Sequence, residues 1–296
     1  MNVPQQVLNV RGRGSRVASL DRLRFTFICA TSAFICVFAL TETQAAAEPI
    51  KSEIAARLQR ALPDVKPADY ALGSAAFDAE LRARLEENAS AGADAVVAGR
   101  ALWTARFRDG RTLASCFPNG GRRIAQNYPQ YDSRLKRVVT LEMAVNQCLK
   151  THGQPLYEPA DSATMGLVIA YVRSLADGQK IAVRVPPAAE AKFAEGSRLY
   201  FTRMGQRNFA CASCHLENAG RHYGEAALSP AIGQATHWPV IRGGAPVTLH
   251  ARIRECLELM GAAPFAAGSE ELNHLEYFLA YLSNGLPLKA NAWREK

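Results

Sequence analysis

The sequence predicts a mainly helical protein built from two similar domains, and three observations lead to this prediction. Segments with apolar residues at every third or fourth position recur through most of the chain after residue 47. Alternation of apolar and polar residues, the mark of a half-buried strand, is scarce. Finally, the two halves share anchor residues in the same order, and a repeat of roughly a hundred residues indicates a domain duplication.

The amphipathic pattern predicts six helices. The segment that most resembles a strand is interpreted as a linker. Residues 181–185 alternate weakly and are followed by Pro186 and Pro187, which favours a connection between domains. The predicted helices at 162–175 and 270–282 stop before glycine-containing turns, as helices commonly do. The predicted helices are residues 52–62, 75–87, 93–105, 162–175, 248–260 and 270–282.

The first 47 residues have the order of a secretory signal peptide. Five arginines occur within the first 24 residues, a mostly apolar run of 16 residues follows from Phe25 to Leu40, and small residues lead to Ala47. This order predicts cleavage near Ala47. The alternative is an uncleaved anchor, but the run is shorter than the roughly 18 residues that a membrane span needs. We therefore expect no membrane association after cleavage.

Removing residues 1–47 changes the formal net charge from +8 to +5 and leaves five cysteines. A mildly basic surface can attract anions or acidic partners. No run of like charges argues for nucleic acid as a partner. The exported chain is long enough for one large or two small domains.

The repeat aligns three sets of anchors. Positions 113–117 correspond to 211–215, Thr140 and Cys148 correspond to Thr248 and Cys256, and the glycine turn at 175–178 corresponds to that at 282–285. We therefore predict a first domain over residues 48–180 and a second over residues 181–296.

The second domain contains Cys211-Ala-Ser-Cys214-His215. Two cysteines three positions apart, followed by histidine, are the attachment signature of haem c: the thiols bond one porphyrin edge and the histidine binds iron. A zinc site would need a second ligand pair, and a thioredoxin-like pair would need a βαβ context. Bacteria attach haem c outside the cytoplasm, so the motif and the signal together predict a periplasmic protein with cytochrome c-like domains.

The first domain lacks this signature. Leu113 stands where the first attaching cysteine is expected and Phe117 stands where the histidine is expected, so we predict a single covalent haem c per chain. Cys116 and Cys148 correspond to Cys214 and Cys256. With no haem between them, they are predicted to form a disulfide, the alternative being two separate buried thiols.

The sixth iron ligand has several candidates. Methionine commonly fills this position, and Met204 or Met260 would serve. Cys256 is favoured because it remains unpaired, although a free cysteine is often only a small buried apolar residue. The histidines at 222, 237, 250 and 274 are further candidates.

Arg252 lies four residues before Cys256 on a predicted helix, so both side chains share one face. A nearby guanidinium lowers the pKa of a thiol and offers a planar pair of donors to an oxyanion. Arg242 is a further candidate for this pocket, whereas Arg254 is expected to point into solvent.

The sequence resembles the SoxA family, the cytochrome subunit of the SoxAX thiosulfate-oxidising complex. The resemblance covers nearly the whole exported chain. It is carried by the haem motif 211–215 and by segments 237–242, 249–256, 262–265 and 275–287, with 116–121 and 128–132 in the first domain.

The resemblance implies a haem-dependent L-cysteine S-thiosulfotransferase that joins thiosulfate to a carrier cysteine on SoxYZ. It implies a SoxX-type cytochrome c as heterodimer partner and a downstream cytochrome as electron acceptor. Cys211 and Cys214 would attach the haem, His215 and Cys256 would bind iron, Cys256 would be catalytic, and Arg252 would bind the substrate.

Two departures from the family pattern stand out. Some members carry a second haem in the first domain, whereas this sequence looks like the single-haem type. Gly261 occupies a segment in which an arginine is expected. The alternatives to the enzyme are a periplasmic cytochrome that only carries electrons and a scaffold subunit with a structural haem.

Overall fold

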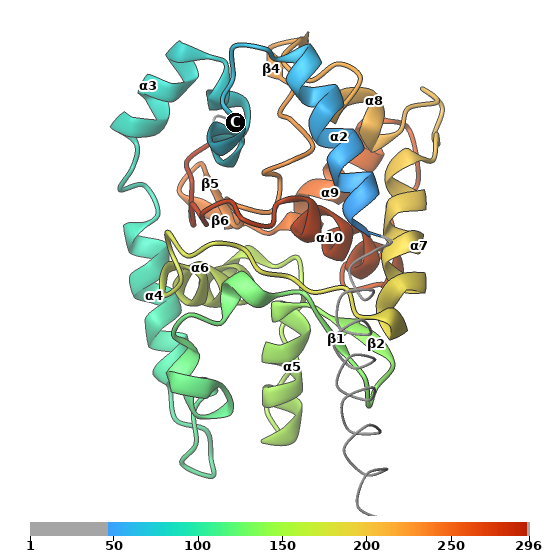
Figure 1. Ribbon diagram of the computed structural model, residues 1–296. Helices are drawn as coiled ribbons and strands as arrows, with labels where there is room; N and C mark the ends of the chain where they lie inside the picture. The colour runs from blue at the N-terminus through green and yellow to red at the C-terminus, as the bar shows by residue number, and fades with distance from the viewer. Residues whose placement is uncertain (1–46, 295–296) are drawn as a thin grey trace, which may run out of the picture. The chain divides into compact units, whose positions relative to one another are not determined.

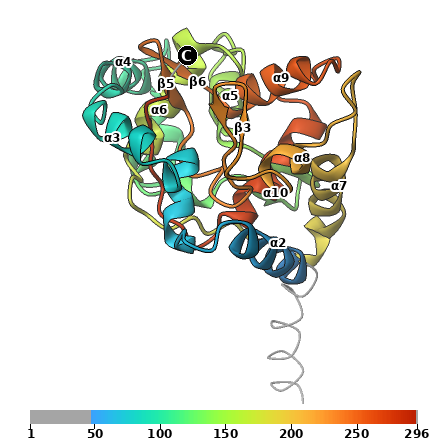
Figure 2. The same ribbon diagram turned by 90° about the horizontal axis from the view of Figure 1, so that it is seen from above.

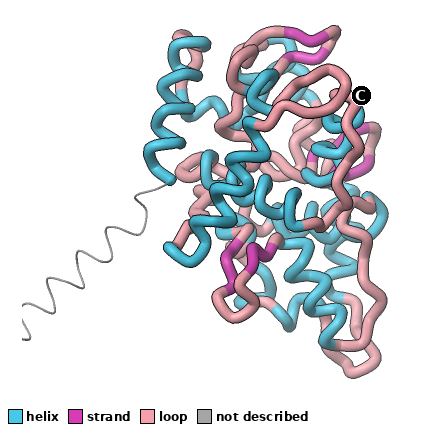
Figure 3. Tube along the Cα trace, turned by 90° about the vertical axis from the view of Figure 1, so that its right-hand side faces the viewer, coloured by secondary structure: helices cyan, strands magenta, loops and turns pink. Residues whose placement is uncertain are grey.

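The computed structural model describes residues 47–294, and apart from Ala47 the expected signal peptide lies outside them. The expectation of a mainly helical protein is confirmed. Within the described residues the strands form three two-stranded antiparallel hairpins, which Figure 3 shows as short magenta segments among cyan helices. None of the described helices is long and apolar enough to cross a membrane.

The longer helices are α2 (Ala47–Ala61), α3 (Ala79–Glu87), α4 (Ala93–Thr104), α5 (Leu141–Thr151), α6 (Leu167–Ser174), α7 (Glu190–Phe201), α9 (Leu249–Leu259) and α10 (Glu270–Leu282), with the single turn α8 (Cys211–His215). Short 3-10 or π turns are η1 (Pro67–Ala76), η2 (Leu113–Cys116), η3 (Pro118–Gly121), η4 (Ala125–Asn127), η5 (Ser162–Gly166) and η6 (Pro187–Ala189). The hairpins pair β1 (Gln130–Asp132) with β2 (Arg137–Val139), β3 (His222–Tyr223) with β4 (Ala226–Ala227), and β5 (Val240–Arg242) with β6 (Ala245–Val247).

Helix α10 is the centre of the core. Every residue from Leu272 to Leu282 is buried, although the sequence predicts only one apolar stripe on this helix. Figure 1 shows α10 in the middle of the described chain, with α7 beside it. The two helices approach closely at Gly196, where a Cβ would lie 2.0 Å from the His274 carbonyl oxygen. Only glycine fits there, because real non-bonded carbon–oxygen contacts exceed 3 Å.

The first half repeats this helix crossing. A Cβ on Gly99 of α4 would lie 1.9 Å from the carbonyl oxygen of Leu167 on α6. Gly99 and Gly196 are each the seventh residue of their helix. In each half a β-hairpin ends at a threonine, Thr140 or Thr248, which caps the following helix through its hydroxyl. The two halves thus share both their closest helix contact and their hairpin–helix unit.

Most predicted helices agree with the structure within one or two residues, but two starts were wrong. The helix predicted from residue 75 begins at Ala79, because Asp78 caps it: its Oδ1 accepts the Leu81 N–H at 2.9 Å. Helix α2 begins at Ala47 rather than at residue 52. The helix predicted at 162–175 starts as the π turn η5 and continues as α6. Residues 181–185 belong to none of the strands.

The N-terminal segment of the described chain packs against the second half. The Lys51 ammonium donates to the Asn284 carbonyl oxygen at 2.9 Å, and the Tyr281 hydroxyl donates to the Glu48 carboxylate at 2.6 Å. Further along, the Ser74 hydroxyl donates to the Ala227 carbonyl oxygen at 2.7 Å. Figures 1 and 2 both show α2 beside α7 and α10. Residues 47–76 therefore contribute to the structural support of the second half.

A buried charged cluster joins the two halves. Glu142 and Arg173 come from the first half and Glu276 from the second, and all three line a cavity of about 20 Å³. His250 of α9 lies 3.1 Å from the Glu276 carboxylate. The Arg173 guanidinium donates to the Ala235 carbonyl oxygen at 2.7 Å. The cluster brings charged side chains of α5, α6, α9 and α10 together at the contact between the two halves.

Candidate functional site

The haem-attachment motif forms the single helical turn α8. The Ser213 hydroxyl accepts the Ala210 N–H at 3.1 Å at the start of this turn, and the Asn218 side chain donates to the Ser213 carbonyl oxygen at 2.8 Å. These bonds fix the turn at both ends, which places Cys211, Cys214 and His215 on one short rigid unit. The corresponding turn η2 of the first half has an equivalent bond from Thr112 N–H to the Ser115 hydroxyl.

His215 is held as a neutral imidazole. Its Nδ1 donates to the Ser229 carbonyl oxygen at 2.9 Å, so Nε2 carries the available lone pair. Burial and, to a smaller extent, the Arg252 cation lower the pKa of His215 to about 4, against the effect of the Ser229 bond. A backbone partner of this kind orients metal-binding histidines in general.

Cys256 lies on α9 and faces the attachment motif. Burial raises the pKa of Cys211 to about 12, and repulsion from a Cys256 thiolate contributes in the same direction. Burial and Cys256 likewise raise the pKa of Cys214. These electrostatic interactions place the Cys256 thiol near both attachment thiols. Burial also raises the pKa of Cys256, while Arg252 one turn earlier opposes this effect.

Glu255 binds two arginines next to Cys256. Arg242 of β5 donates to both carboxylate oxygens of Glu255, one of these bonds at 2.9 Å, and Arg252 donates at 3.0 Å. Although burial opposes it, these bonds and charges lower the pKa of Glu255. We call Arg242, Arg252 and Glu255 the arginine–glutamate clamp. It holds a net charge of +1 beside Cys256. Its acidic member, Glu255, was not among the residues predicted from the sequence.

The histidines considered as iron ligands are engaged elsewhere. His250 pairs with Glu276, and the His274 Nδ1 lies 2.8 Å from the Glu195 carboxylate. His237 contacts the Thr236 hydroxyl at 3.2 Å, and His222 is exposed, with its Nε2 4.0 Å from Asp78. These contacts give each histidine a structural partner. Met260 is buried where α9 ends, and Met204 forms an isolated β-bridge with Phe209.

Two residues next to the clamp differ from expectation in an informative way. Arg254, expected in solvent, is only partly exposed and has a buried Nε with no hydrogen-bond partner among the described residues. Gly261 follows the end of α9 with a φ of +73°, and a Cβ there would lie 3.0 Å from the Gln206 Cβ. A glycine in this left-handed conformation commonly ends a helix. The backbone therefore disfavours an arginine at position 261.

The first half contains no equivalent of this site. Cys116 and Cys148 form a disulfide with a Cα–Cα distance of 6.0 Å, the pairing expected from the repeat. Phe117, at the position of His215, is buried against Trp103 with ring centroids 5.0 Å apart. Apolar packing and a covalent bond thus occupy the place where the second half has a histidine and free thiols.

The donors around α8 fit a haem c. Two neighbouring thiols on one turn, together with a neutral histidine whose Nε2 is available, are the set that this group requires. The third thiol, Cys256 on α9, is close enough to interact electrostatically with both attachment thiols. Haem c supplies one-electron redox chemistry when it is bound.

Comparison with known proteins identifies the family. Residues 98–181 and 195–288 match the model of the SoxA/TsdA cytochrome c domain. The chain is 41% identical over 245 residues to the L-cysteine S-thiosulfotransferase subunit SoxA of Chlorobaculum tepidum, covering 80% of this chain and 84% of the relative. The SoxA subunit of Allochromatium vinosum is 37% identical, with 86% and 92% covered.

A solved structure agrees with these matches. The crystal structure of SoxXA from P. pantotrophus superposes with a TM-score of 0.64 at 27% identity, covering 69% of this chain and 78% of that chain. The family match spans more than half of the chain and falls in both halves. The chain therefore belongs to the SoxA family of cytochrome c-domain proteins, the SoxA subunits of L-cysteine S-thiosulfotransferase.

Proposed function

We propose that the chain is the haem-carrying subunit of a periplasmic L-cysteine S-thiosulfotransferase that joins thiosulfate to a carrier cysteine. The observation that supports this proposal is the closeness of Cys256 to the haem motif and to Arg252, which lies one helical turn earlier. Its partners are a SoxX-type cytochrome c, as the name of the SoxXA structure suggests, the SoxYZ carrier and a downstream cytochrome.

One haem c per chain is attached through Cys211 and Cys214, with His215 and Cys256 as iron ligands. The Ser229 bond to His215 supports the first ligand, and the interactions of Cys256 with both attachment thiols support the second. The first domain has no haem. This is supported by Leu113 at the place of a cysteine, by the burial of Phe117 and by the disulfide.

The two cytochrome c-like domains arose by duplication. Support comes from the matched glycine contacts of Gly99 and Gly196, and from the two separate matches to the family domain. The boundary lies near residue 180, with residues 1–47 as the signal peptide. The packing of residues 47–76 on the second half gives this N-terminal segment a structural role outside the repeat.

Arg252 binds the oxyanion end of thiosulfate, and the Cys256 sulfur bonds the sulfane end of the intact anion as two electrons leave; the carrier thiolate then displaces Cys256 from this sulfur. A guanidinium offers paired donors to an oxyanion, and the partly exposed Arg252 side chain retains donors besides the one bonded to Glu255. In the overall reaction a sulfur–sulfur bond forms between thiosulfate and the carrier cysteine. One proton and two electrons leave, and the electrons pass to the downstream acceptor.

The decisive experiment is loading of the carrier by purified variants mixed with SoxX, SoxYZ, thiosulfate and an electron acceptor. Cys256→Ala should abolish loading while the attached haem is retained. Arg252→Ala should lower kcat/KM by about 10-fold to 150-fold, the size of a lost charged hydrogen bond. Arg203→Ala, which removes a half-exposed arginine bonded to the Asn208 carbonyl oxygen, is the matched control and should leave loading unchanged. Loading by Cys256→Ala at the unmodified rate would refute the proposal.

A further inference from the structure

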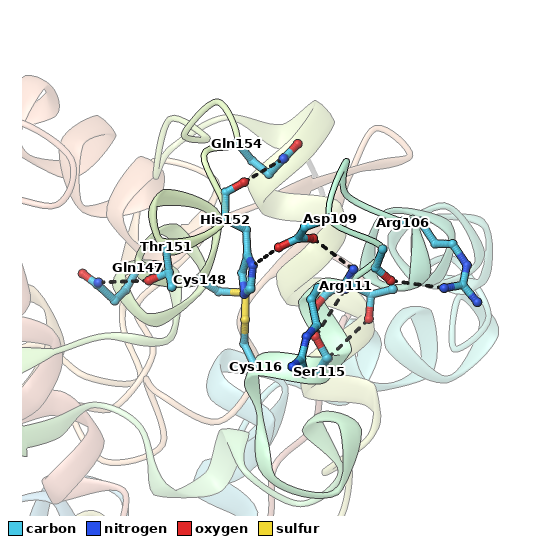
Figure 4. A network of polar contacts seen from close by, with 12 residues as sticks. Arg106, Asp109, Arg111, Ser115, Cys116, Gln147, Cys148, Thr151, His152 and Gln154 are labelled. Atoms are coloured by element: carbon cyan, nitrogen blue, oxygen red, sulfur yellow. Dashed lines mark hydrogen bonds and ion pairs between the residues drawn. A yellow bond between two sulfur atoms is a disulfide. The ribbon is translucent and has the colours of Figure 1, made fainter.

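A second sulfur-containing cluster lies in the first half, and the proposed function does not use it. It consists of the Cys116–Cys148 disulfide, His152 and Asp109, shown in Figure 4. A nitrogen of the His152 ring and the two sulfur atoms all lie within 4.8 Å of one another. The disulfide is asymmetric, because Cys116 is exposed whereas Cys148 is 5% exposed.

Two short elements bring this cluster together. Cys148 lies in the last turn of α5 and His152 caps its end, so the spacing of four residues puts both on one face. Asp109 lies in the loop at residues 105–112, which leads directly into η2 and Cys116. The disulfide and the histidine–aspartate pair therefore connect the same two elements.

The histidine ring is held in a defined orientation. Its Nδ1 lies 2.6 Å from the Asp109 carboxylate, and the Phe107 ring packs against it with centroids 5.4 Å apart. The Arg111 N–H donates to Asp109 at 3.0 Å, and this bond, followed by the one to His152, lowers the pKa of Asp109. Because the carboxylate engages Nδ1, Nε2 is the nitrogen that can exchange a proton beside the disulfide.

The charges around the exposed sulfur favour an anionic reactant. Arg106, Arg108 and Arg111 are all exposed on the loop that leads to Cys116, and Asp109 is the single acid among them. A local excess of positive charge raises the concentration and the encounter rate of anions. The thiolate is also the reactive form of a thiol.

We propose that Cys116–Cys148 is a thiol–disulfide exchange site for anionic thiols, with His152 as its proton carrier. The incoming thiol gives its proton to His152, and its sulfur attacks the exposed Cys116 Sγ. The Cys116–Cys148 bond breaks, and the Cys148 sulfur leaves and receives the proton from His152. A dithiol completes the reaction when its second sulfur displaces Cys116, so the dithiol becomes a disulfide and the protein gains two thiols.

This inference does not depend on the proposed thiosulfotransferase function, and it differs from a purely structural role for the disulfide. A disulfide that serves only stability reacts with external thiols when the fold opens, so its reaction follows unfolding. An exchange site reacts in the folded protein, at one sulfur, and with a rate that depends on His152.

The test is the reaction of the folded haem-containing protein with 2-mercaptoethanesulfonate, an anionic thiol, and with cysteamine, a cationic one. Each rate is divided by the rate of the same thiol with a small linear disulfide, and peptide mass analysis locates the adduct. We expect a mixed disulfide at Cys116 in native buffer and a relative rate that is higher for the anionic thiol. His152→Gln should lower the rate by about 100-fold or more, the lower range of proton-transfer catalysis.

Two further variants complete the design. His222→Gln removes an exposed histidine that also lies near an aspartate, and it should leave the exchange rate unchanged. The double variant Arg108→Gln/Arg111→Gln should reduce the preference for the anionic thiol. Equal rates for the unmodified protein and His152→Gln would overturn the proposal, as would exchange that occurs only at urea concentrations that unfold the chain. If His152→Gln fails to fold, Asp109→Asn provides the same comparison with the ring intact.

Discussion

Neutralising Glu142 should remove a large pH dependence from the stability of the fold. Its Oε2 is buried with no hydrogen-bond partner among the described residues, and the residue lines the cavity between the two halves. Burial raises the pKa of Glu142 from 4.5 to about 7, and repulsion from Glu276 adds to this, against the attraction of His250 and Arg173. The folded protein therefore binds a proton that the unfolded chain releases near pH 4.5.

The sign and size of the effect follow from this difference. Between pH 4.5 and about 7 the folded state holds more protons than the unfolded state, so stability falls as the pH rises. A pKa difference of about two and a half corresponds to about 3 kcal/mol, since each unit is worth about 1.4 kcal/mol. Glu142→Gln should therefore stabilise the protein by about 3 kcal/mol at pH 8 and change little at pH 4.

Urea unfolding of the haem-containing protein at several pH values measures this effect. The pKa of His250 is also raised, because the hydrogen bond and the charge of Glu276 outweigh the effect of burial. The stability that His250 contributes is therefore also lost as the pH rises. Glu142 is one of the charges that raise the pKa of His250, so the comparison reports the Glu142 charge together with its effect on His250. Glu80→Gln is the control, because the Glu80 side chain is 85% exposed and should change stability by less than about 0.5 kcal/mol. An equal pH dependence of stability for Glu142→Gln and Glu80→Gln would refute the reasoning.

Three further predictions concern the helix crossing, the clamp and the disulfide. Gly196→Ala should destabilise the fold by about 1–3 kcal/mol or more in urea unfolding, because its Cβ would lie 2.0 Å from the His274 carbonyl oxygen; an unchanged midpoint would contradict the close contact. Glu255→Gln should raise the affinity of the holoprotein for both thiosulfate and sulfate, because it raises the clamp charge from +1 to +2. Calorimetric titration measures this affinity. Equal affinities of the variant and the unmodified protein would show that Glu255 does not tune the site. Cys116→Ser/Cys148→Ser should cost about 2–5 kcal/mol of stability yet leave one haem per chain by intact mass; loss of that haem would show that the first half is needed for attachment.

The features that could be predicted from the sequence are those encoded by neighbours in the chain. The last long helix at 270–282, the turn that carries Cys211 and Cys214, and the Arg252–Cys256 spacing all follow from local periodicity or motif. The start of α3 is also encoded locally, since Asp78 is a strong N-cap residue.

The missed features depend on contacts between distant segments. Glu255 of α9 reaches Arg242 of β5 over 13 positions, and His152 reaches Asp109 over 43 positions. Neither pair has a motif, and charged residues at such spacings are common on solvated surfaces. The packing of residues 47–76 on the second half likewise has no periodic signal, because periodicity reveals which face is buried and not what covers it.

The two halves differ in how one helical turn is joined to the helix that follows the hairpin. In each half, the turn after the first long helix must be joined to the helix that follows the hairpin. The first half joins η2 to α5 by the Cys116–Cys148 bond, and Phe117 on Trp103 fills the space beside it. In the second half the corresponding residues, Cys214 and Cys256, lie on α8 and α9 and remain free thiols. Burial raises the pKa of both thiols, and repulsion from Cys256 adds to this at Cys214; the proposed haem would link these two residues in place of a disulfide. Loss of haem should therefore loosen the second half more than the first, because only the first has its own covalent link.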